Sequence, residues 1–198
     1  MRQLARIIGA VVLVAGCGSN STTPGPTAIV EPTPIVTLGP SVTPVPTSGV
    51  VIDSRLLDIL PATVGGLRMA ENPDGEASAL TDAELPAVGS SMAAGLAVDQ
   101  STGDFVYAIV VRLLPGAMDD GVFRDWRDSY DQGACSQAGG VAGNAEAQID
   151  GRTVYIGTCS GGVRTYHVWL QPQESLISAS AVGDRRFGEL LMNTLRVP

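Results

Sequence analysis

Apolar residues recur at alternating positions in several segments of the chain, and residues 104–114 form the clearest of these. Every odd-numbered position from Phe105 to Leu113 is apolar, and so is every even-numbered position from Val106 to Val110. Successive side chains of a strand point to opposite faces of a sheet, so this pattern predicts a strand that is covered on both faces. We therefore place residues 104–114 in the centre of a sheet.

Similar alternation predicts four more strands toward the C-terminus, over residues 145–149, 152–159, 163–171 and 175–182. Asp150-Gly151 separates the first two, and this dipeptide is typical of a tight hairpin turn. Gly161-Gly162 and Pro172 mark the two turns that follow. Because all three connections are short, neighbouring strands are expected to pair antiparallel.

Helical spacing predicts a helix over residues 119–132, whose inward face carries Val122, Phe123, Trp126 and Tyr130. Gly133 is expected to end this helix, because glycine adopts the backbone conformation that closes a last turn. A closing helix is expected after a cap at Asp184, with a buried stripe of Phe187, Leu190, Leu191 and Leu195.

Two helices are predicted before the central strand. The first covers residues 54–60, begins at a cap on Asp53 or Ser54 and stops before Pro61. For the second, Thr81 and Glu84 have the spacing of a capping box. Apolar residues then follow at helical spacing, namely Leu85, Val88, Met92 and Leu96.

These elements predict an α+β fold, in which helices pack on an antiparallel sheet of about five strands. Residues 51–198 are expected to form it as a single globular domain, since a chain of this length can bury a sizeable core.

The charge of this domain excludes a nucleic-acid partner. Residues 51–198 contain ten arginines, no lysine and 19 acidic residues, which gives a net charge of −9. A phosphate-binding surface needs clustered basic side chains that displace counterions, and no such cluster is found.

The N-terminus has the organisation of an export signal. Arg2 and Arg6 precede a short apolar run over residues 7–15. This run ends in Leu13-Val-Ala-Gly-Cys17, which resembles the lipobox of bacterial lipoproteins. The resemblance implies cleavage after Gly16, so that residues 1–16 are a signal peptide, and a diacylglycerol on Cys17. The alternative is an ordinary signal peptide that happens to contain a cysteine.

Prolines and threonines dominate the segment that follows Cys17. Proline fixes φ and removes a backbone donor, so residues 17–50 are expected to form a disordered, extended linker. Two acyl chains suffice to hold a protein at a bilayer, so the linker would separate the domain from the membrane. The expected location is therefore the extracytoplasmic face of the cell membrane.

One lipid and one disulfide account for the three cysteines. With Cys17 lipidated, Cys135 and Cys159 remain as a pair in an oxidising compartment, and we expect them to form a structural disulfide. The rival is a redox or metal pair, but the sequence has neither a CxxC motif nor the further ligands of a zinc site. No cofactor or metal is expected.

No catalytic residue is predicted. His167 is the sole histidine and would share a strand face with Thr165 and Trp169, which fits either a general base or a histidine at the edge of the core. A nucleophilic triad also needs an activated serine. The strongest candidate among turn serines is Ser160, for which plain turn chemistry is the better interpretation.

Two further groups of residues are candidate binding sites, one for a cation and one for a ligand. The acidic run comprises Asp119, Asp120, Asp125, Asp128 and Asp131. It lacks the spacing of a calcium loop and is interrupted by arginines, which favours a solvated helix face with Arg124–Asp128 and Arg127–Asp131 pairs. The aromatic group comprises Trp126, Tyr155, Tyr166 and Trp169, which fits either a ligand cleft or the core.

The sequence thus predicts a membrane-anchored extracytoplasmic lipoprotein whose domain is a non-enzymatic binding or accessory module of the cell envelope. Its partners would be the membrane, through the lipid on Cys17, and an envelope protein or a small ligand. The alternatives are a solute-binding lipoprotein of a transporter and a small hydrolase that uses His167.

Overall fold

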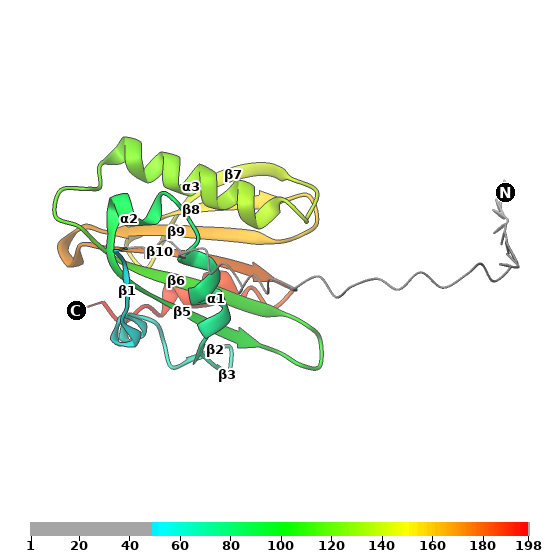
Figure 1. Cartoon of the computed structure of the whole chain (residues 1–198). Coiled ribbons are helices and arrows are strands. Elements are labelled where there is room, and N and C mark those ends of the chain that lie inside the picture. Colours follow the sequence, from blue (N-terminus) through cyan, green and yellow to red (C-terminus); the bar gives the residue numbers. More distant parts are fainter. Residues whose placement is uncertain (1–48, 198) are drawn as a thin grey trace, which may run out of the picture. The chain divides into compact units, whose positions relative to one another are not determined.

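A computed structural model of the protein describes residues 49–197. The predicted signal peptide, Cys17 and nearly all of the linker lie outside the described residues. The described part has an α+β fold, in which helices cover a large mixed sheet (Figure 1). No helix in residues 49–197 is long and apolar enough to cross a membrane.

The strands are β1 (Val51–Ile52), β2 (Thr63–Val64), β3 (Leu67–Arg68), β4 (Ala70–Glu71), β5 (Gly89–Val98), β6 (Phe105–Leu113), β7 (Val141–Ile149), β8 (Arg152–Cys159), β9 (Arg164–Leu170) and β10 (Ser175–Val182). The helices are η1 (Ser54–Ile59), α1 (Pro73–Ala79), α2 (Leu85–Val88), α3 (Asp120–Cys135), η2 (Gln171–Gln173) and α4 (Phe187–Asn193), of which η1 and η2 are 3₁₀-helices.

The main sheet has eight strands, so the prediction of about five was too low. Seven of them follow the order β1-β5-β6-β10-β9-β8-β7, and β4 also pairs with β5. All five predicted strands are present, and the additional ones are β1, β4 and β5. Strand β1 runs parallel to β5, whereas the other pairs of this sheet are antiparallel. As predicted, β6 is an internal strand, with β5 on one side and β10 on the other.

The predicted helix through Met92 and Leu96 is wrong. Helix α2 ends at Val88, and residues 89–98 form strand β5. Residues four apart share a face in a strand as well as in a helix, so the spacing that predicted the helix does not separate the two structures. The decisive feature is tertiary: small residues such as Ala93 and Ala94 are fully buried on opposite faces of β5.

Several helix ends also differ from the predictions. Helix α3 continues past Gly133 to Cys135, where the disulfide fixes its last turn. Helix α4 begins after Arg186 instead of Asp184, and Leu190 is exposed although it was placed in the buried stripe. The predicted cap at Asp53 is confirmed by its side chain, which accepts a hydrogen bond from the Arg55 amide.

Helices pack on both faces of the sheet. In Figure 1, α1 and α3 lie in front of the sheet and α4 lies behind it. The face behind carries an apolar cluster from β5, β6, β9 and β10, closed by α4 and η1, with Tyr166, Phe187 and Leu191 almost fully buried. The face in front carries a second cluster, which includes Phe123 and Trp126 of α3.

Candidate functional site

Buried polar side chains gather on the sheet face that α3 covers. Alternation along β9 places Thr165 and His167 on this face, and alternation along β10 does the same for Ser178 and Ser180. The strand register sets Ser178 opposite His167 and Ser180 opposite Thr165. All four are buried, and a buried polar group is costly unless it is hydrogen-bonded. Their partners therefore define the site.

His167 is completely buried, and both of its ring nitrogens have partners. Its Nε2 lies 2.8 Å from Oδ1 of Asp131, and its Nδ1 lies 2.9 Å from Oγ of Ser178. A carboxylate only accepts hydrogen bonds, so Nε2 carries the proton and donates to Asp131. The Ser178 hydroxyl is the hydrogen-bond partner of Nδ1. Both ring nitrogens are therefore hydrogen-bonded inside the protein.

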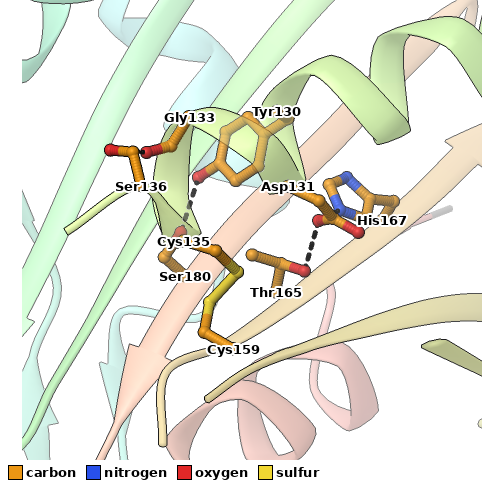
Figure 2. Close-up of a disulfide and its surroundings, with 9 residues drawn as sticks. All are labelled: Tyr130, Asp131, Gly133, Cys135, Ser136, Cys159, Thr165, His167 and Ser180. Atoms are coloured by element: carbon orange, nitrogen blue, oxygen red, sulfur yellow. Dashed lines mark hydrogen bonds and ion pairs between the residues drawn. A yellow bond between two sulfur atoms is a disulfide. The ribbon is translucent and has the colours of Figure 1, made fainter. Parts of the chain in front are cut away.

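Two more side chains complete the network, part of which is drawn in Figure 2. The indole Nε1 of Trp126 donates to Oγ of Ser178 at 2.9 Å, and the hydroxyl of Thr165 donates to Asp131. Burial raises the pKa of the Asp131 carboxyl, but the hydrogen bonds from His167 and Thr165 outweigh it and hold that pKa below its ordinary value. Asp131 therefore stays ionised inside the protein.

The buried position of Asp131 corrects the predicted acidic face of α3. Asp131 is 5% exposed and bonds to β9, while the other four aspartates of the run are exposed as predicted. Arg127 pairs with Asp128 instead of Asp131, and its guanidinium stacks on Tyr155. Gly157 of β8 makes room for the carboxylate, because a Cβ at this position would overlap both Asp131 and Thr165.

The network has the residue types of a serine-hydrolase triad but not its geometry. In such a triad the serine is accessible to substrate, whereas Ser178 is 1% exposed. The imidazole is also reversed, with Nδ1 toward the serine and Nε2 toward the aspartate. The arrangement therefore supports a structural role, in which the network ties α3 to β9 and β10.

A cleft of about 570 Å³ lies directly beside this network. Strands β6 and β10 line one side of it, through Phe105, Tyr107, Ile109 and Ser180. The end of α1 with the segment that leads to α2, and one side of α3, line the rest. This volume is within the range of small-molecule sites. Trp126 and Tyr130 line the cleft from α3, and the Tyr130 ring also packs edge-on against His167 at 5.2 Å. The network thus holds two of the aromatic side chains that line the cleft.

Protein groups already satisfy the polar atoms of the aromatic residues in the cleft. The Trp126 N–H is bonded to Ser178, the Tyr130 hydroxyl lies 3.1 Å from Ser180 Oγ, and the Tyr107 hydroxyl donates to the Gly75 carbonyl at 3.3 Å. Burial, reinforced by the charge of Glu76, raises the pKa of Tyr107 to about 12. Burial raises the pKa of Tyr130 as well. Both phenols are therefore neutral, and these residues offer mainly ring carbons to the cleft.

The charged residues that line the cleft are both acidic, Asp82 and Glu84, and no arginine lines it. Both are exposed, and neither forms an ion pair within residues 49–197. The cleft therefore combines apolar ring surface with an unneutralised negative rim.

No family model, curated protein or solved structure matches this chain. The site therefore has to be judged on its own geometry.

A second cleft, of about 810 Å³, lies near the start of α4 and is a weaker candidate. Both of its arginines are engaged by one carboxylate, because Arg164 lies 3.0 Å and Arg186 lies 3.4 Å from Oε1 of Glu189. Its two aromatic residues, Tyr166 and Phe187, are almost fully buried in the apolar cluster. Asp184 and Oε2 of Glu189 also belong to residues that line this cleft and are left without an ion pair or hydrogen bond among the described residues, but no aromatic ring surface accompanies them.

The structure brings together only some of the residues singled out from the sequence. Cys135 and Cys159 form the predicted disulfide, which joins the end of α3 to the end of β8 near the network (Figure 2). Of the four aromatics weighed as a cleft, only Trp126 lines the one beside the network. Ser160 lies exposed in the β8–β9 turn. It is not next to His167, because the residue of β8 that pairs with His167 is Tyr155. Within residues 49–197, no group of three or more acidic, histidine or cysteine side chains is arranged to hold a metal ion.

Sequence reasoning missed Asp131, Ser178 and the α1–α2 side of the cleft. A signal for Asp131 was present in its spacing, because it lies eight residues after Phe123 and four before Cys135 and so falls on the buried face of α3. A signal for α1 was present in Asn72-Pro73, since Asn is a preferred cap and Pro a preferred first residue of a helix.

Proposed function

We propose that this protein is a non-enzymatic binding domain, tethered to the extracytoplasmic face of a membrane through a lipid on Cys17, and that the cleft beside α3 is its ligand site. The single observation that carries the binding role is the cleft, which combines ring surface with the carboxylates of Asp82 and Glu84, neither of which forms an ion pair within residues 49–197. The anchor rests on the lipobox-like residues 13–17, and an extracytoplasmic location agrees with the Cys135–Cys159 disulfide.

The binding role is tested by blocking the cleft. Ser129 is exposed on α3 and lines the cleft, whereas Gln132 is exposed on the same helix and does not line it. We expect Ser129→Phe to fill the cleft without disturbing the core, and Gln132→Phe to be its matched control.

The readout is the pair of indole N–H signals in a ¹H–¹⁵N spectrum of the full chain, because the protein has two tryptophans and only Trp126 lines this cleft. A panel of small soluble fragments should shift the Trp126 signal and leave the Trp169 signal in place. Ser129→Phe should abolish these shifts, and Gln132→Phe should retain them. The proposed site would be contradicted if the fragments bound Ser129→Phe as well as the wild-type chain. It would also be contradicted if no fragment of the panel shifted the Trp126 signal.

The anchor is tested separately in a bacterial host fed with labelled palmitate. The wild-type chain should incorporate the label and sediment with membranes, and Cys17→Ser should do neither. The Cys135→Ser/Cys159→Ser variant should keep the label, since its lipid site is intact. Label on Cys17→Ser would refute lipidation at this residue.

A further inference from the structure

The cleft beside α3 has a specific electrostatic character. Of its lining residues, Phe105, Tyr107, Trp126 and Tyr130 are aromatic, and the two charged ones, Asp82 and Glu84, are both acidic. An aromatic ring attracts a cation through its quadrupole, and it discriminates against an anion for the same reason. The lining of the cleft therefore favours positively charged ligands over negatively charged ones.

The surroundings of the cleft strengthen this selection. Glu76 of α1 is buried and accepts a hydrogen bond from the Ala94 amide, close enough to Tyr107 to raise the pKa of its phenol. Asp131 lies behind the wall formed by Trp126 and Tyr130, where it is held ionised by His167 and Thr165. Neither arginine of α3 lines the cleft, and Arg127 is engaged with Asp128 and Tyr155.

The hydrogen bonds of the aromatic residues narrow the chemistry further. The polar atoms of Tyr107, Trp126 and Tyr130 are occupied by Gly75, Ser178 and Ser180. These residues therefore present few free donors or acceptors to the many hydroxyl groups of a neutral sugar. A ligand that needs no hydrogen bond at its charged centre, such as a quaternary ammonium group, can instead be stabilised by ring surface and by the two carboxylates.

We infer that the cleft binds an organic cation, with its alkylated ammonium centre against the rings of Phe105, Tyr107, Trp126 and Tyr130 and within reach of the carboxylates of Asp82 and Glu84. This inference rests on the proposed function, because it names the ligand class of the same cleft. The volume of about 570 Å³ exceeds that of a lone ammonium head group, so the remainder of the ligand also fits inside.

The test uses three probes of nearly the same shape that differ in charge: choline, its neutral carbon isostere 3,3-dimethylbutan-1-ol, and the anion 3,3-dimethylbutanoate. Each is titrated into the lipidated full chain in a polyoxyethylene detergent, and the Trp126 and Trp169 indole signals are followed. Choline should shift Trp126 and bind about three- to thirtyfold more tightly than the neutral isostere, which is the range of cation–π discrimination. The anion should bind more weakly than both.

Substitutions in the rim assign the effect to the two carboxylates. Glu84→Gln and Asp82→Asn should each reduce the affinity for choline by about two- to fivefold, as expected for exposed charges, and leave the neutral isostere unchanged. Asp58→Asn is the matched control, because it removes one exposed carboxylate of η1 that does not line the cleft. It should leave both affinities as in the wild-type chain.

The outcomes separate this inference from the proposed function. If the neutral isostere, the anion or methyl glucoside binds at Trp126 as tightly as choline, the cleft remains a binding site and the cation inference is wrong. If none of these probes and no fragment of the wider panel moves Trp126, both the inference and the proposed function fail.

Discussion

The two faces of the sheet differ in the kind of side chain that they bury. Behind the sheet, α4 and η1 cover an apolar cluster in which Tyr166, Phe187 and Leu191 pack almost without exposure. In front of it, α3 covers His167, Ser178 and Thr165, and the aspartate that it contributes to them, Asp131, is ionised. The apolar cluster behind the sheet needs only complementary volume. The face in front also has an apolar cluster, but its polar network needs every partner in place, and we call it the polar face for that reason.

This difference bears on function, because the open cleft lies on the polar face. The network fixes the Trp126 indole by its N–H and lies against the Tyr130 ring, so two aromatic side chains of the cleft have defined positions before a ligand arrives. A binding site gains affinity when its side chains are already ordered. We therefore interpret the buried network as support for the cleft.

The largest effect expected on the polar face comes from His167→Leu. It removes the donor to Asp131 and leaves a buried carboxylate with Thr165 as its main partner, which should lower the free energy of unfolding by about 3–5 kcal/mol. Urea titration of the purified chain measures the loss. Because the cost arises from the unpaired charge, adding Asp131→Asn should recover part of it.

Leu191→Ala is the matched test of the apolar face. It creates a cavity under α4 and should cost about 2–5 kcal/mol, a similar amount. Adding Asp131→Asn to this variant should lower its stability further, because no residue of the apolar cluster leaves the Asp131 carboxylate unpaired. The costs of the two substitutions should therefore add. Equal responses of the two faces to Asp131→Asn would remove the distinction between them.

Loss of the disulfide is expected to lower the free energy of unfolding slightly less than loss of His167 does. The Cys135→Ser/Cys159→Ser variant frees the end of α3 from β8, and the closed loop of 24 residues corresponds to about 3.5 kcal/mol in the chain-entropy model. A marked fall in melting temperature should accompany it, and the wild-type chain under reducing conditions should match the variant. An unchanged melting temperature would show that the bridge is not structural.

The smallest effect is that of Asp131→Asn alone, about 1–3 kcal/mol near neutral pH. The wild-type carboxyl has a lower pKa in the folded chain than in the unfolded chain. Its contribution to the free energy of unfolding is therefore present above the ordinary pKa of aspartate, about 4. This contribution is lost as the pH falls through the pKa of the folded chain. In urea titrations between pH 5 and pH 2, the variant should therefore lose less stability than the wild type. Asp58→Asn controls for the removal of one charge, and parallel curves for wild type and Asp131→Asn would contradict this account.

Much of the fold followed from the sequence because its strands carry strong local signals. Alternation located β6, β8, β9 and β10, and Asp150-Gly151 located the β7–β8 turn, where both residues have positive φ. Strand β5 was missed because its small residues fit a strand only against the neighbours that bury them. The disulfide was predictable because the lipobox resemblance set Cys17 apart, which left Cys135 and Cys159 as a pair.

The candidate site was far less predictable. His167 was visible as a lone histidine on an apolar strand, but its partners Asp131 and Ser178 lie 36 and 11 residues away along the chain. The spacing of Asp131 places it on the buried face of α3, but its bond to β9 depends on how α3 is oriented on the sheet and on the space that Gly157 leaves. This second condition is tertiary and leaves no pattern in a single sequence.

The most direct test of the central claim is photo-crosslinking in living cells, with an amino acid that carries a small aliphatic diazirine, so that the cleft stays open, placed at Ser129 in one chain and at Gln132 in another. Mass spectrometry of the purified chains then identifies what each position captures. The account predicts one dominant small-molecule adduct at position 129 that is absent at position 132. Identical adducts at both positions, or none at position 129, would contradict a ligand site in the cleft beside α3.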